Sequence, residues 1–528
     1  MSTSVKGKDE TVVEMVEHSL SNSPSNSDQM AKVVEHEFME AEKQMTIWQA
    51  AKAHKRILLY CAVPYLCGMT YGYDVIANGA TLAMPSFLLY FGAFDSAGNL
   101  FIPSIWTSLW VAMTNLGQAV GSLIGGPLAH RFGRRYIIMV FSIVSIVGVA
   151  LQFTATTRGV LLGGKIINGF AVGGLLAVGT TYASEVAPLR LRAPIQQGLV
   201  FCSVVMQGVG LGVIRAFVPR MDPTAFRIVF GLQWVVGSLP LLAFFIPESP
   251  TWLLSRGRTD DARASLNRLY NGNNVEPRLD ALQATLTAET LGEKAGSFAE
   301  CFKGTNLKRT ATVALLFFGS GGLIGASFLS QNIYFLLTVG LEAVHSFDIG
   351  IGGFFLACVA IAIGWVFTDV IGRRRLWLVG VSGNSVAMAV IGALSFDSSR
   401  AGLWAIAVLM NVLISFQIYT CVSTSWTMAP ELSSYRLRQH TQSFGYVIQA
   451  LSSWLFQFAV PYMYNVDSGN LGAKTGFVFA GTSVLLFCIS WFVVPETAGL
   501  TVEDIDAAYI DNVSPRKFHL RRQTAVGV

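Results

Sequence analysis

The sequence predicts an all-α membrane protein whose twelve transmembrane helices form two six-helix bundles. The first reason is composition, because the 528 residues are 52% hydrophobic and only 13% charged, with a mean hydropathy of +0.51. Soluble domains carry about 25% charged residues. The second reason is a set of twelve apolar runs, each near the ~20 residues that a helix needs to cross ~30 Å of hydrocarbon. The third is that several motifs recur, in order, in both halves of the chain.

The twelve apolar runs are expected to be helices. They are too long and too continuous for the alternating strands of a membrane barrel. Their bounds are 57–77, 105–126, 136–154, 160–182, 194–218, 226–246, 310–336, 348–368, 376–395, 402–428, 441–463 and 476–494.

The short loops predict the orientation, since arginine and lysine favour the cytoplasmic side. The loops after the second, fourth, eighth and tenth runs are basic, while those after the first and seventh hold no Lys or Arg. Both termini are therefore expected in the cytoplasm, although Arg215, Arg220 and Arg227 run against this bias. The basic loops contain Arg131, Arg134, Arg135, Arg190, Arg192, Arg373, Arg374, Arg375, Arg436 and Arg438.

The polar segments complete the expected organisation. A cytoplasmic segment (1–56), partly an amphipathic helix over 31–55, precedes an N-terminal bundle (57–246). Amphipathic linker helices (247–309) lead to a C-terminal bundle (310–494) and a short cytoplasmic tail (495–528).

Three pairs of motifs indicate that the two bundles are homologous. "HRFGRR" (130–135) returns as "DVIGRR" (369–374), "SEVAPLRLR" (184–192) as "PELSSYRLR" (430–438), and "PESPTWLL" (247–254) as "PETAGL" (495–500). Repeated halves with a binding site between them are typical of secondary transporters.

These motifs together resemble the sugar porter family of the major facilitator superfamily, over about residues 45–510. The segments "SFAECFKGTNLKRT" (297–310) and "ELSSYRLRQHT" (431–441) are similar in sequence to the corresponding segments of fungal α-glucoside permeases. The resemblance implies two bundles that rock about a central sugar site, so that the site opens alternately to either side.

Two ionisable side chains lie well inside the apolar runs, Asp74 and Lys165. A lone charge at the bilayer centre costs about 3 kcal/mol or more, so such groups usually face the bundle interior and pair. The topology places both residues in the outer half, where an ion pair is expected. The resemblance implies that Asp74 binds the transported proton, although the family partner is Arg and Lys165 lacks its bidentate fork. A static structural pair, or an acid at the outer vestibule, is the alternative.

Charges at the cytoplasmic helix ends form a second expected group. The resemblance implies salt bridges that latch the inner face in the outward-open state and break when it opens inward. His130 replaces the usual Asp of the first loop, which predicts a weaker or pH-sensitive latch there. The alternative is that these arginines only set the topology. The network comprises Arg134, Glu185, Arg192, Glu248, Arg373, Glu431, Arg438 and Glu496.

A sugar site needs hydroxyl partners and an aromatic platform on inward helix faces. Matching family positions selects Tyr71, Gln207 and Trp426, with Gln449 as a weaker candidate, although Trp426 fits a packing role as well. The span at 310–336 lacks the usual amides and instead has "GSGG" (319–322), with Gln331 and Asn332 later. The glycines are expected to leave room for a disaccharide or another bulky ligand.

Other classes of function are disfavoured. The seven cysteines show no metal-ligand spacing, and no phosphate loop, catalytic carboxylate pair or nucleophile motif appears. We expect no enzyme activity, cofactor, metal or nucleic-acid partner. The favoured hypothesis is a plasma-membrane, proton-coupled importer of a sugar, an α-glucoside or a hexose. A transporter of a non-sugar solute such as a secondary metabolite, or a transport-dead nutrient sensor, remains open.

Overall fold

The computed structural model describes residues 47–94, 98, 100–272, 275–293, 298–397, 399–433, 437–497, 500, 502–511 and 513–520. The expected amphipathic segment up to residue 46 lies outside the described residues, as do Arg436 and the side chains of Arg190, Arg192 and Arg438.

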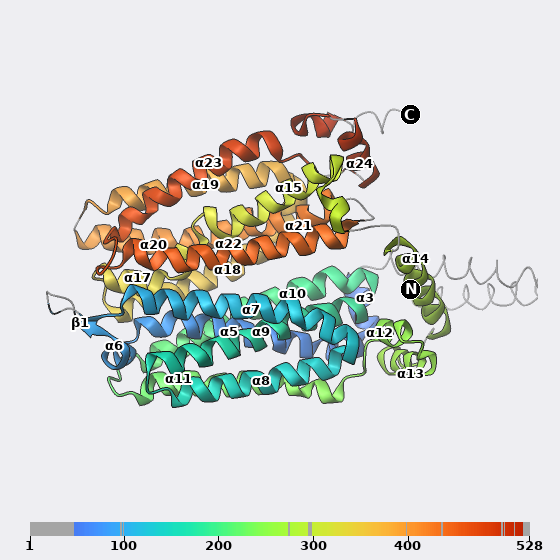
Figure 1. The fold of residues 1–528 in the computed structure, drawn as a ribbon, viewed down its shortest axis with the longest axis horizontal. Helices are drawn as coiled ribbons and strands as arrows, with labels where there is room; N and C mark the ends of the chain where they lie inside the picture. The colour runs from blue at the N-terminus through green and yellow to red at the C-terminus, as the bar shows by residue number, and fades with distance from the viewer. Residues whose placement is uncertain are drawn as a thin grey trace, which may run out of the picture.

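The first half of the chain forms one helical bundle (Figure 1). Two short helices, α3 and α4, lead into α5, and the 3-10 turn η2 extends α11. Between α5 and α7 lie the turn η1, the helix α6 and a hairpin in which Ala93 pairs with Phe101 and Phe94 with Leu100. The bounds are α3 (Ile47–Ala53), α4 (Lys55–Tyr60), α5 (Ala62–Ala80), η1 (Thr81–Ala83), α6 (Pro85–Phe91), β1 (Ala93–Phe94), β2 (Leu100–Phe101), α7 (Ser104–Phe132), α8 (Arg134–Thr154), α9 (Arg158–Val186), α10 (Leu189–Phe217), α11 (Thr224–Ser238) and η2 (Leu239–Phe245).

The second half repeats the arrangement with two interrupted spans. The expected span 310–336 is broken into α15, the π-helical turn η4, α16 and α17, because its glycine-rich centre does not continue an α-helix. A second π turn, η5, joins α20 to α21. The bounds are α15 (Gly304–Phe318), η4 (Gly319–Leu323), α16 (Ala326–Ser330), α17 (Asn332–Thr338), α18 (Ala343–Ile371), α19 (Arg373–Leu394), α20 (Arg400–Gln417), η5 (Ile418–Val422), α21 (Ser423–Leu432), α22 (Arg438–Tyr464) and α23 (Thr475–Val493).

The predicted fold class is confirmed, because these helices account for twelve spans in two six-helix bundles within the described residues. Eight helices are long and apolar enough to cross a membrane by composition alone. The spans built on α5, α7, α15 and α22 fall outside that group. Each of these spans contains polar side chains that are buried, including Asp74, Gln118, Thr312 and Ser452.

The linker and tail lie together at one end of the molecule, which we call the linker end (Figure 1). The β1–β2 hairpin lies at the opposite end, the hairpin end. The elements at the linker end are α12 (Pro250–Ser255), α13 (Thr259–Tyr270), α14 (Val275–Glu293), η3 (Phe298–Phe302), α24 (Val502–Ile510) and η8 (Pro515–Leu520).

Within the N-terminal bundle, glycines bring helix backbones into direct contact. A Cβ atom added at Gly121 of α7 would lie 1.9 Å from the carbonyl oxygen of Phe170 in α9. One added at Gly72 of α5 would lie 2.2 Å from the carbonyl oxygen of Ser203 in α10. Small residues allow the close helix packing that stabilises membrane bundles.

We therefore expect Gly121→Ala to destabilise the protein by about 1–3 kcal/mol, because the new methyl group has no space against a rigid backbone. Gly126 lies on the same helix with no atom within 4 Å of its added Cβ, so Gly126→Ala is the matched control. Thermal unfolding of the two variants in detergent measures the difference. Equal melting temperatures would contradict the predicted helix contact.

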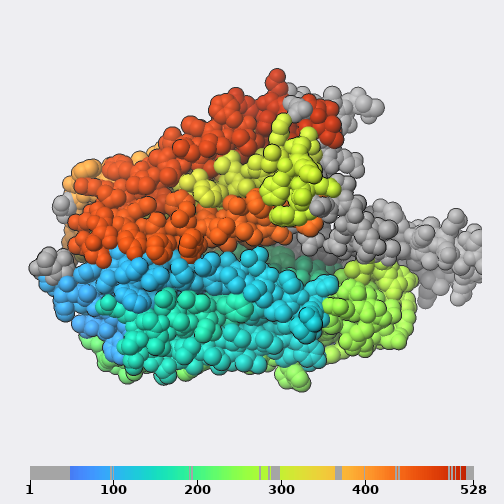
Figure 2. Space-filling model, viewed as in Figure 1, coloured from blue at the N-terminus to red at the C-terminus, as the bar shows by residue number. Residues whose placement is uncertain are grey.

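The two bundles contact one another most closely at the hairpin end. Pairs of helices, α7 with α22 and α10 with α18, pack across the interface. Toward the linker end the halves draw apart (Figure 2). The described hydrogen bonds and ion pairs between α5–α11 and α15–α23 all lie toward the hairpin end, including Ser108 Oγ to the Phe458 carbonyl (2.8 Å) and Arg215 to Asp348 (2.7 Å).

Four further bonds form what we call the clasp, made of Ile102, Ser104, Tyr334, Asn465 and Asp467. The Ile102 N–H donates to the Tyr334 hydroxyl (3.1 Å), and the Asn465 amide donates to the Ile102 carbonyl (3.1 Å). The Ser104 N–H donates to the Asp467 carboxylate (2.8 Å), as does the Ser104 hydroxyl. The clasp fixes the start of α7 to the C-terminal bundle.

Candidate functional site

Asp74 is an almost completely buried carboxylate, 2% exposed, on α5. Lys165 on α9 is 0% exposed. Both side chains therefore lie inside the N-terminal bundle, away from the solvent-exposed surface. A charge in such a place must be stabilised by polar neighbours.

Four carboxamides surround the Asp74 carboxylate and donate hydrogen bonds to it. Asn168 of α9 is the closest at 2.6 Å, followed by Asn78 of α5 at 2.9 Å. Gln118 of α7 donates at 3.2 Å and Gln233 of α11 at 3.4 Å. Amides from four helices thus solvate one negative charge without a direct cation.

The expected direct ion pair between Asp74 and Lys165 is not formed, since no oxygen of that carboxylate lies within 4.0 Å of the ammonium. Instead Lys165 donates to the side-chain oxygen of Asn78 (2.7 Å) and to the Asn78 carbonyl (3.4 Å). The face of Phe230 lies 5.7 Å from the ammonium. Asn78 therefore links the two charges, with its oxygen toward the lysine and its N–H toward the aspartate.

A small cavity lies beside Asp74 between α5, α8, α9 and α11. Its volume is about 10 Å³, roughly the room of one water molecule. Its lining is mainly polar and includes Thr70, Ser145, Asn168 and Gln233. Ser145 donates its hydroxyl hydrogen to the Asn168 side-chain oxygen at 2.6 Å.

Sequence reasoning missed the amide cluster. One local signal was available, because Asn78 follows Asp74 by four residues and shares its helix face. Asn168 likewise follows Lys165 by three. Gln118 and Gln233 lie in two other apolar runs, and no spacing in the sequence shows that they converge on Asp74.

The predicted substrate residues fall into two groups, and the first is available for a ligand. Tyr71, Gln207 and Gln449 are half-buried, and in the described part of the chain their side chains make no hydrogen bond. Trp426 is 48% exposed and stacks on Tyr446 at 4.8 Å between ring centres. Phe317 meets Trp426 edge-on at 5.7 Å, so Trp426 belongs to an aromatic cluster with an open face.

The second group, Gln331 and Asn332, is engaged inside the C-terminal bundle. Gln331 donates to Gln457 (3.3 Å) and accepts from Tyr464 (2.9 Å). Asn332 donates to Asn411 at 3.3 Å. Both side chains are buried, so in this conformation neither is available to a solute.

The expectation that the 319–322 glycines leave room for a bulky ligand is wrong. A Cβ atom at Gly322 would lie 2.1 Å from the Phe456 ring, and one at Gly321 3.0 Å from the Gln449 carbonyl oxygen. The glycines instead let α22 pack directly against η4. Their space is filled by protein.

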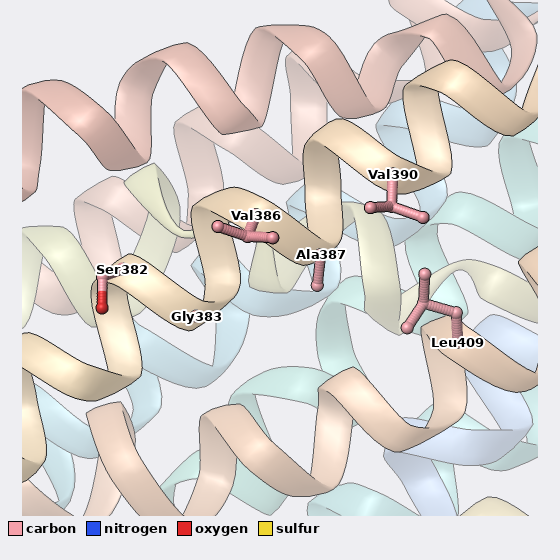
Figure 3. Close-up of a pocket in the computed structure, with 6 residues that line it drawn as sticks. All are labelled: Ser382, Gly383, Val386, Ala387, Val390 and Leu409. Carbon is pink, nitrogen blue, oxygen red and sulfur yellow. The ribbon is translucent and has the colours of Figure 1, made fainter.

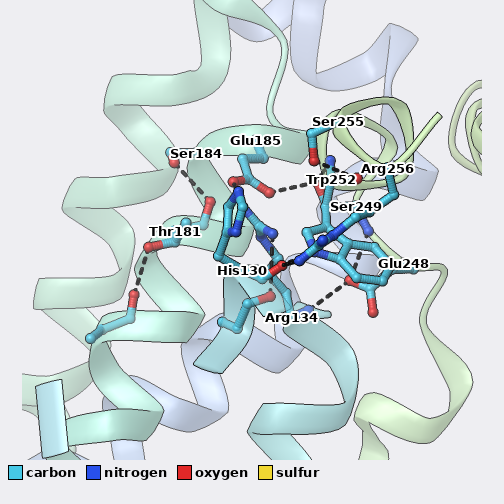
Figure 4. A network of polar contacts seen from close by, with 12 residues as sticks. His130, Arg134, Thr181, Ser184, Glu185, Glu248, Ser249, Trp252, Ser255 and Arg256 are labelled. Carbon is cyan, nitrogen blue, oxygen red and sulfur yellow. Dashed lines mark hydrogen bonds and ion pairs between the residues drawn. The ribbon is translucent and has the colours of Figure 1, made fainter. Parts of the chain in front are cut away.

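At the linker end, Arg134, Glu185, Glu248 and Ser249 form a polar cluster in the N-terminal half (Figure 4). Arg134 pairs with Glu185 at 2.7 Å, and the Ser249 hydroxyl donates to the same carboxylate at 2.5 Å. Glu248 accepts the backbone N–H of Arg134 at 2.9 Å and so caps α8. Burial raises the pKa of Glu248, and the N–H groups that it accepts oppose that shift.

His130 contributes to this cluster through its carbonyl group. That oxygen accepts from the Trp252 indole (2.6 Å) and from Arg256 (2.8 Å). Gly133 begins the turn into α8 with φ +103°, and an added Cβ would lie 2.5 Å from the Glu248 carboxylate. Only glycine is tolerated at such a position.

The C-terminal half contains the matching cluster. Arg373 lies 3.5 Å from Glu431, and the Thr497 hydroxyl donates to Glu431 at 2.6 Å. Glu496 accepts the backbone N–H of Arg373 at 2.9 Å, as Glu248 does for Arg134. Each described cluster connects helices of its own half.

A larger groove lies far from these residues, between α19 and α20 (Figure 3). Its volume is about 490 Å³ and it is lined by Ser382, Gly383, Val386, Ala387, Val390 and Leu409. These mostly apolar residues belong to two membrane-spanning helices. Ser382 is the one residue with a polar side chain among these lining residues. Within the described residues no cluster of His, Cys, Asp and Glu could hold a metal ion.

Comparison with solved structures shows the same fold. The inward open conformation of the xylose transporter XylE from E. coli aligns with a TM-score of 0.66 at 21% identity, covering 85% of this chain and 99% of that one. Its partially occluded inward open conformation gives a TM-score of 0.67, also at 21% identity, over 85% of this chain and 100% of that one.

Curated relatives and a family model identify the lineage. The chain is 51% identical over 501 residues to "MFS transporter fmqE" of Aspergillus fumigatus, covering 92% of this chain and 94% of that protein. It is 26% identical over 489 residues to the "General alpha-glucoside permease" of Saccharomyces cerevisiae, covering 90% and 79%. The family model "Sugar (and other) transporter" matches residues 60–509. The chain therefore belongs to the sugar porter family of the major facilitator superfamily and is a multi-pass membrane transporter.

Proposed function

We propose that this protein is a proton-coupled importer of a neutral sugar, with an α-glucoside or a hexose as the substrate class, and that it is not an enzyme. The observation that carries the proposal is the position of Asp74. Its carboxylate is buried among neutral amides and lies one helical turn from Tyr71, whose hydroxyl has no partner in the described structure. A titratable group and a ligand contact on the same helix turn provide a direct route for coupling.

The chemistry of the candidate site favours a neutral, hydroxylated solute. Tyr71, Gln207 and Gln449 offer hydrogen bonds without net charge, and Trp426 offers an aromatic face. The deeply buried charges Asp74 and Lys165 are occupied by amides. The α-glucoside permease relatives support a sugar as the cargo.

The transport cycle follows from the two ends of the molecule. We assign the linker end to the cytoplasm of a plasma-membrane protein, so the described conformation faces inward with the clasp closed outside. Outward opening breaks the clasp and brings the linker ends together. The Arg134–Glu185 and Arg373–Glu431 clusters then form the inner latch, completed by Arg192 and Arg438.

Proton binding at Asp74 drives the cycle in one direction. With Asp74 ionised, the N–H groups of the four amides hold α5, α7, α9 and α11 together through one carboxylate. Protonation removes that charge and weakens the bonds. Solute bound at Tyr71 then crosses with the proton.

A second candidate function is transport of a flatter, less polar solute on the same scaffold. Helix α22 fills the space beside the glycine run. Gln331 and Asn332 are hydrogen-bonded to other side chains, so neither amide is available to a sugar. The stacked pair of Trp426 and Tyr446 would suit an aromatic compound.

Uptake by cells that express the chain tests the proposal. Radiolabelled maltose, glucose and a panel of aromatic solutes are compared with and without a protonophore. We expect one sugar to accumulate, with loss of accumulation when the protonophore is present and a higher KM in Tyr71→Phe. Accumulation of an aromatic solute alone would favour the second function. Sugar uptake that is indifferent to the protonophore would identify a facilitator and refute coupling.

A further inference from the structure

Three of the four carboxamides around Asp74, Asn78, Asn168 and Gln233, differ in what their side-chain oxygen atoms accept. The Asn78 oxygen accepts from Lys165 at 2.7 Å, and the Asn168 oxygen accepts from Ser145 at 2.6 Å. The Gln233 oxygen is buried without a hydrogen-bond partner in the described structure, on a side chain that is only 4% exposed. A buried amide oxygen without a partner costs about 1–3 kcal/mol.

The observed arrangement suits only the ionised form of Asp74. All four amides direct N–H groups at the carboxylate, which accepts but does not donate. A protonated Asp74 would carry one O–H group that needs an acceptor. Asn78 could supply its oxygen only by leaving Lys165, and Asn168 only by leaving Ser145.

We infer that Gln233 is the positioning residue that accepts the hydrogen bond of protonated Asp74, by turning its side-chain amide over. The inference rests on the proposed function, in which Asp74 carries the transported proton. A proton from solvent binds a carboxylate oxygen, and the new O–H donates to Gln233 Oε1. The Gln233 N–H groups turn toward the adjacent cavity, which Gln233 itself lines. The O–H bond of a hydronium ion breaks as the Asp74 O–H forms, which leaves a water molecule, and no other covalent bond changes.

The geometry makes this exchange easy for Gln233. Its N–H···Asp74 bond, at 3.4 Å, is the longest of the four, so little is lost when it breaks. Thr70 and Ser145 also border the cavity, but neither hydroxyl forms a hydrogen bond with Asp74 in the described structure: Thr70 donates to the Leu66 (2.9 Å) and Val236 (3.0 Å) carbonyls, and Ser145 donates to Asn168. The oxygen of Gln233 gains a partner that it lacks in the ionised state.

The charged and titratable surroundings of Asp74 are few in the described structure. Helix α9 presents Lys165, whose charge acts on Asp74. Helix α5 itself carries Tyr71 and Tyr73, and the Tyr73 hydroxyl donates to the Val229 carbonyl at 3.0 Å. Uncharged groups face Asp74 from three further helices: Gln118 from α7, Ser145 from α8 and Gln233 from α11.

The test compares the pH at which proton-driven uptake is half-maximal in two variants. Gln233→Met keeps the length of the side chain but removes the acceptor, so the midpoint should move by about one unit toward acid. Asn168→Ala removes the 2.6 Å donor to the carboxylate, so its midpoint should move by about one unit toward alkali. Opposite shifts support the inference. Shifts in the same direction, or an unchanged midpoint in Gln233→Met, overturn it.

Two further measurements separate this inference from folding defects and from the proposed function. Gln233→Leu replaces Gln233→Met if the latter does not fold, with proton-independent solute exchange as the check on folding. Infrared spectra of the purified protein report the carbonyl stretch of protonated Asp74, which should rise in frequency when its acceptor is lost; an unchanged frequency overturns the inference. If Asp74→Asn itself accumulates solute normally, the proposed function fails. If Asp74→Asn is uncoupled but the two midpoints shift alike, only the role of Gln233 fails.

Discussion

Asp74→Asn should abolish accumulation of solute while leaving exchange of solute across the membrane intact. Asparagine has nearly the same shape and can still bond to the surrounding amides, but it cannot bind a proton at physiological pH. One proton moving across 100 mV supplies about 2.3 kcal/mol, which corresponds to about fifty-fold accumulation. We expect that factor to disappear in the variant. Uptake against a gradient and counterflow in proteoliposomes measure the two activities.

Asn78→Asp is the matched control variant. It exchanges an amide for an acid on the same helix face as Asp74 and leaves Asp74 unchanged. Asn78 already contacts Lys165 at 2.7 Å, so the new carboxylate pairs with that lysine and some coupling should remain. If Asp74→Asn accumulates solute as the parent does, Asp74 is not the proton site. The static structural pair would then be the correct interpretation.

Asp467→Ala should shift the protein toward the conformation in which the hairpin end is open. The substitution removes both clasp bonds to Ser104 and leaves a backbone N–H without a partner. Hydrogen bonds to a charged group contribute about 1.5–3 kcal/mol, so the population should change at least about tenfold. A cysteine placed at position 108 in a cysteine-free background reports the opening, because Ser108 is buried against Phe458. Its rate of labelling by an impermeant thiol reagent is the readout.

Asp397→Asn provides the control at the same end of the molecule. Asp397 accepts from Ser399 in its own loop at 2.9 Å and 2.8 Å, with no described bond to the other bundle. Labelling of position 108 should be unchanged in that variant. If Asp467→Ala labels no faster than Asp397→Asn, the clasp does not hold the bundles closed.

The fold could be predicted largely from hydropathy and repetition, because lipid imposes simple rules on length and polarity. The four spans with weak hydropathy were still recognisable through their place in the repeat. The break at Gly319–Leu323 was not predicted. A π turn depends on how α22 packs against that segment, and a run of glycines in the sequence is compatible with open space as well as with close contact.

The candidate site was predictable in its charges but not in its partners. Asp74 and Lys165 stand out because ionisable groups are rare in apolar runs. Their connection through Asn78 could not be predicted, because the same sequence is compatible with a direct ion pair and with a pair bridged by Asn78. Gln331 and Asn332 were predicted to bind the solute, but they form hydrogen bonds inside the C-terminal bundle. A polar residue in a span can have either role, and the sequence does not distinguish them.

The clasp has a consequence for how this transporter can change over evolutionary time. On the N-terminal side, three of its four bonds use backbone groups of Ile102 and Ser104. Most substitutions at those positions leave the backbone groups in place. Within the clasp, substitutions therefore act mainly through Tyr334, Asn465 and Asp467. The clasp can thus be weakened by single substitutions in the C-terminal bundle more readily than by substitutions at Ile102 and Ser104.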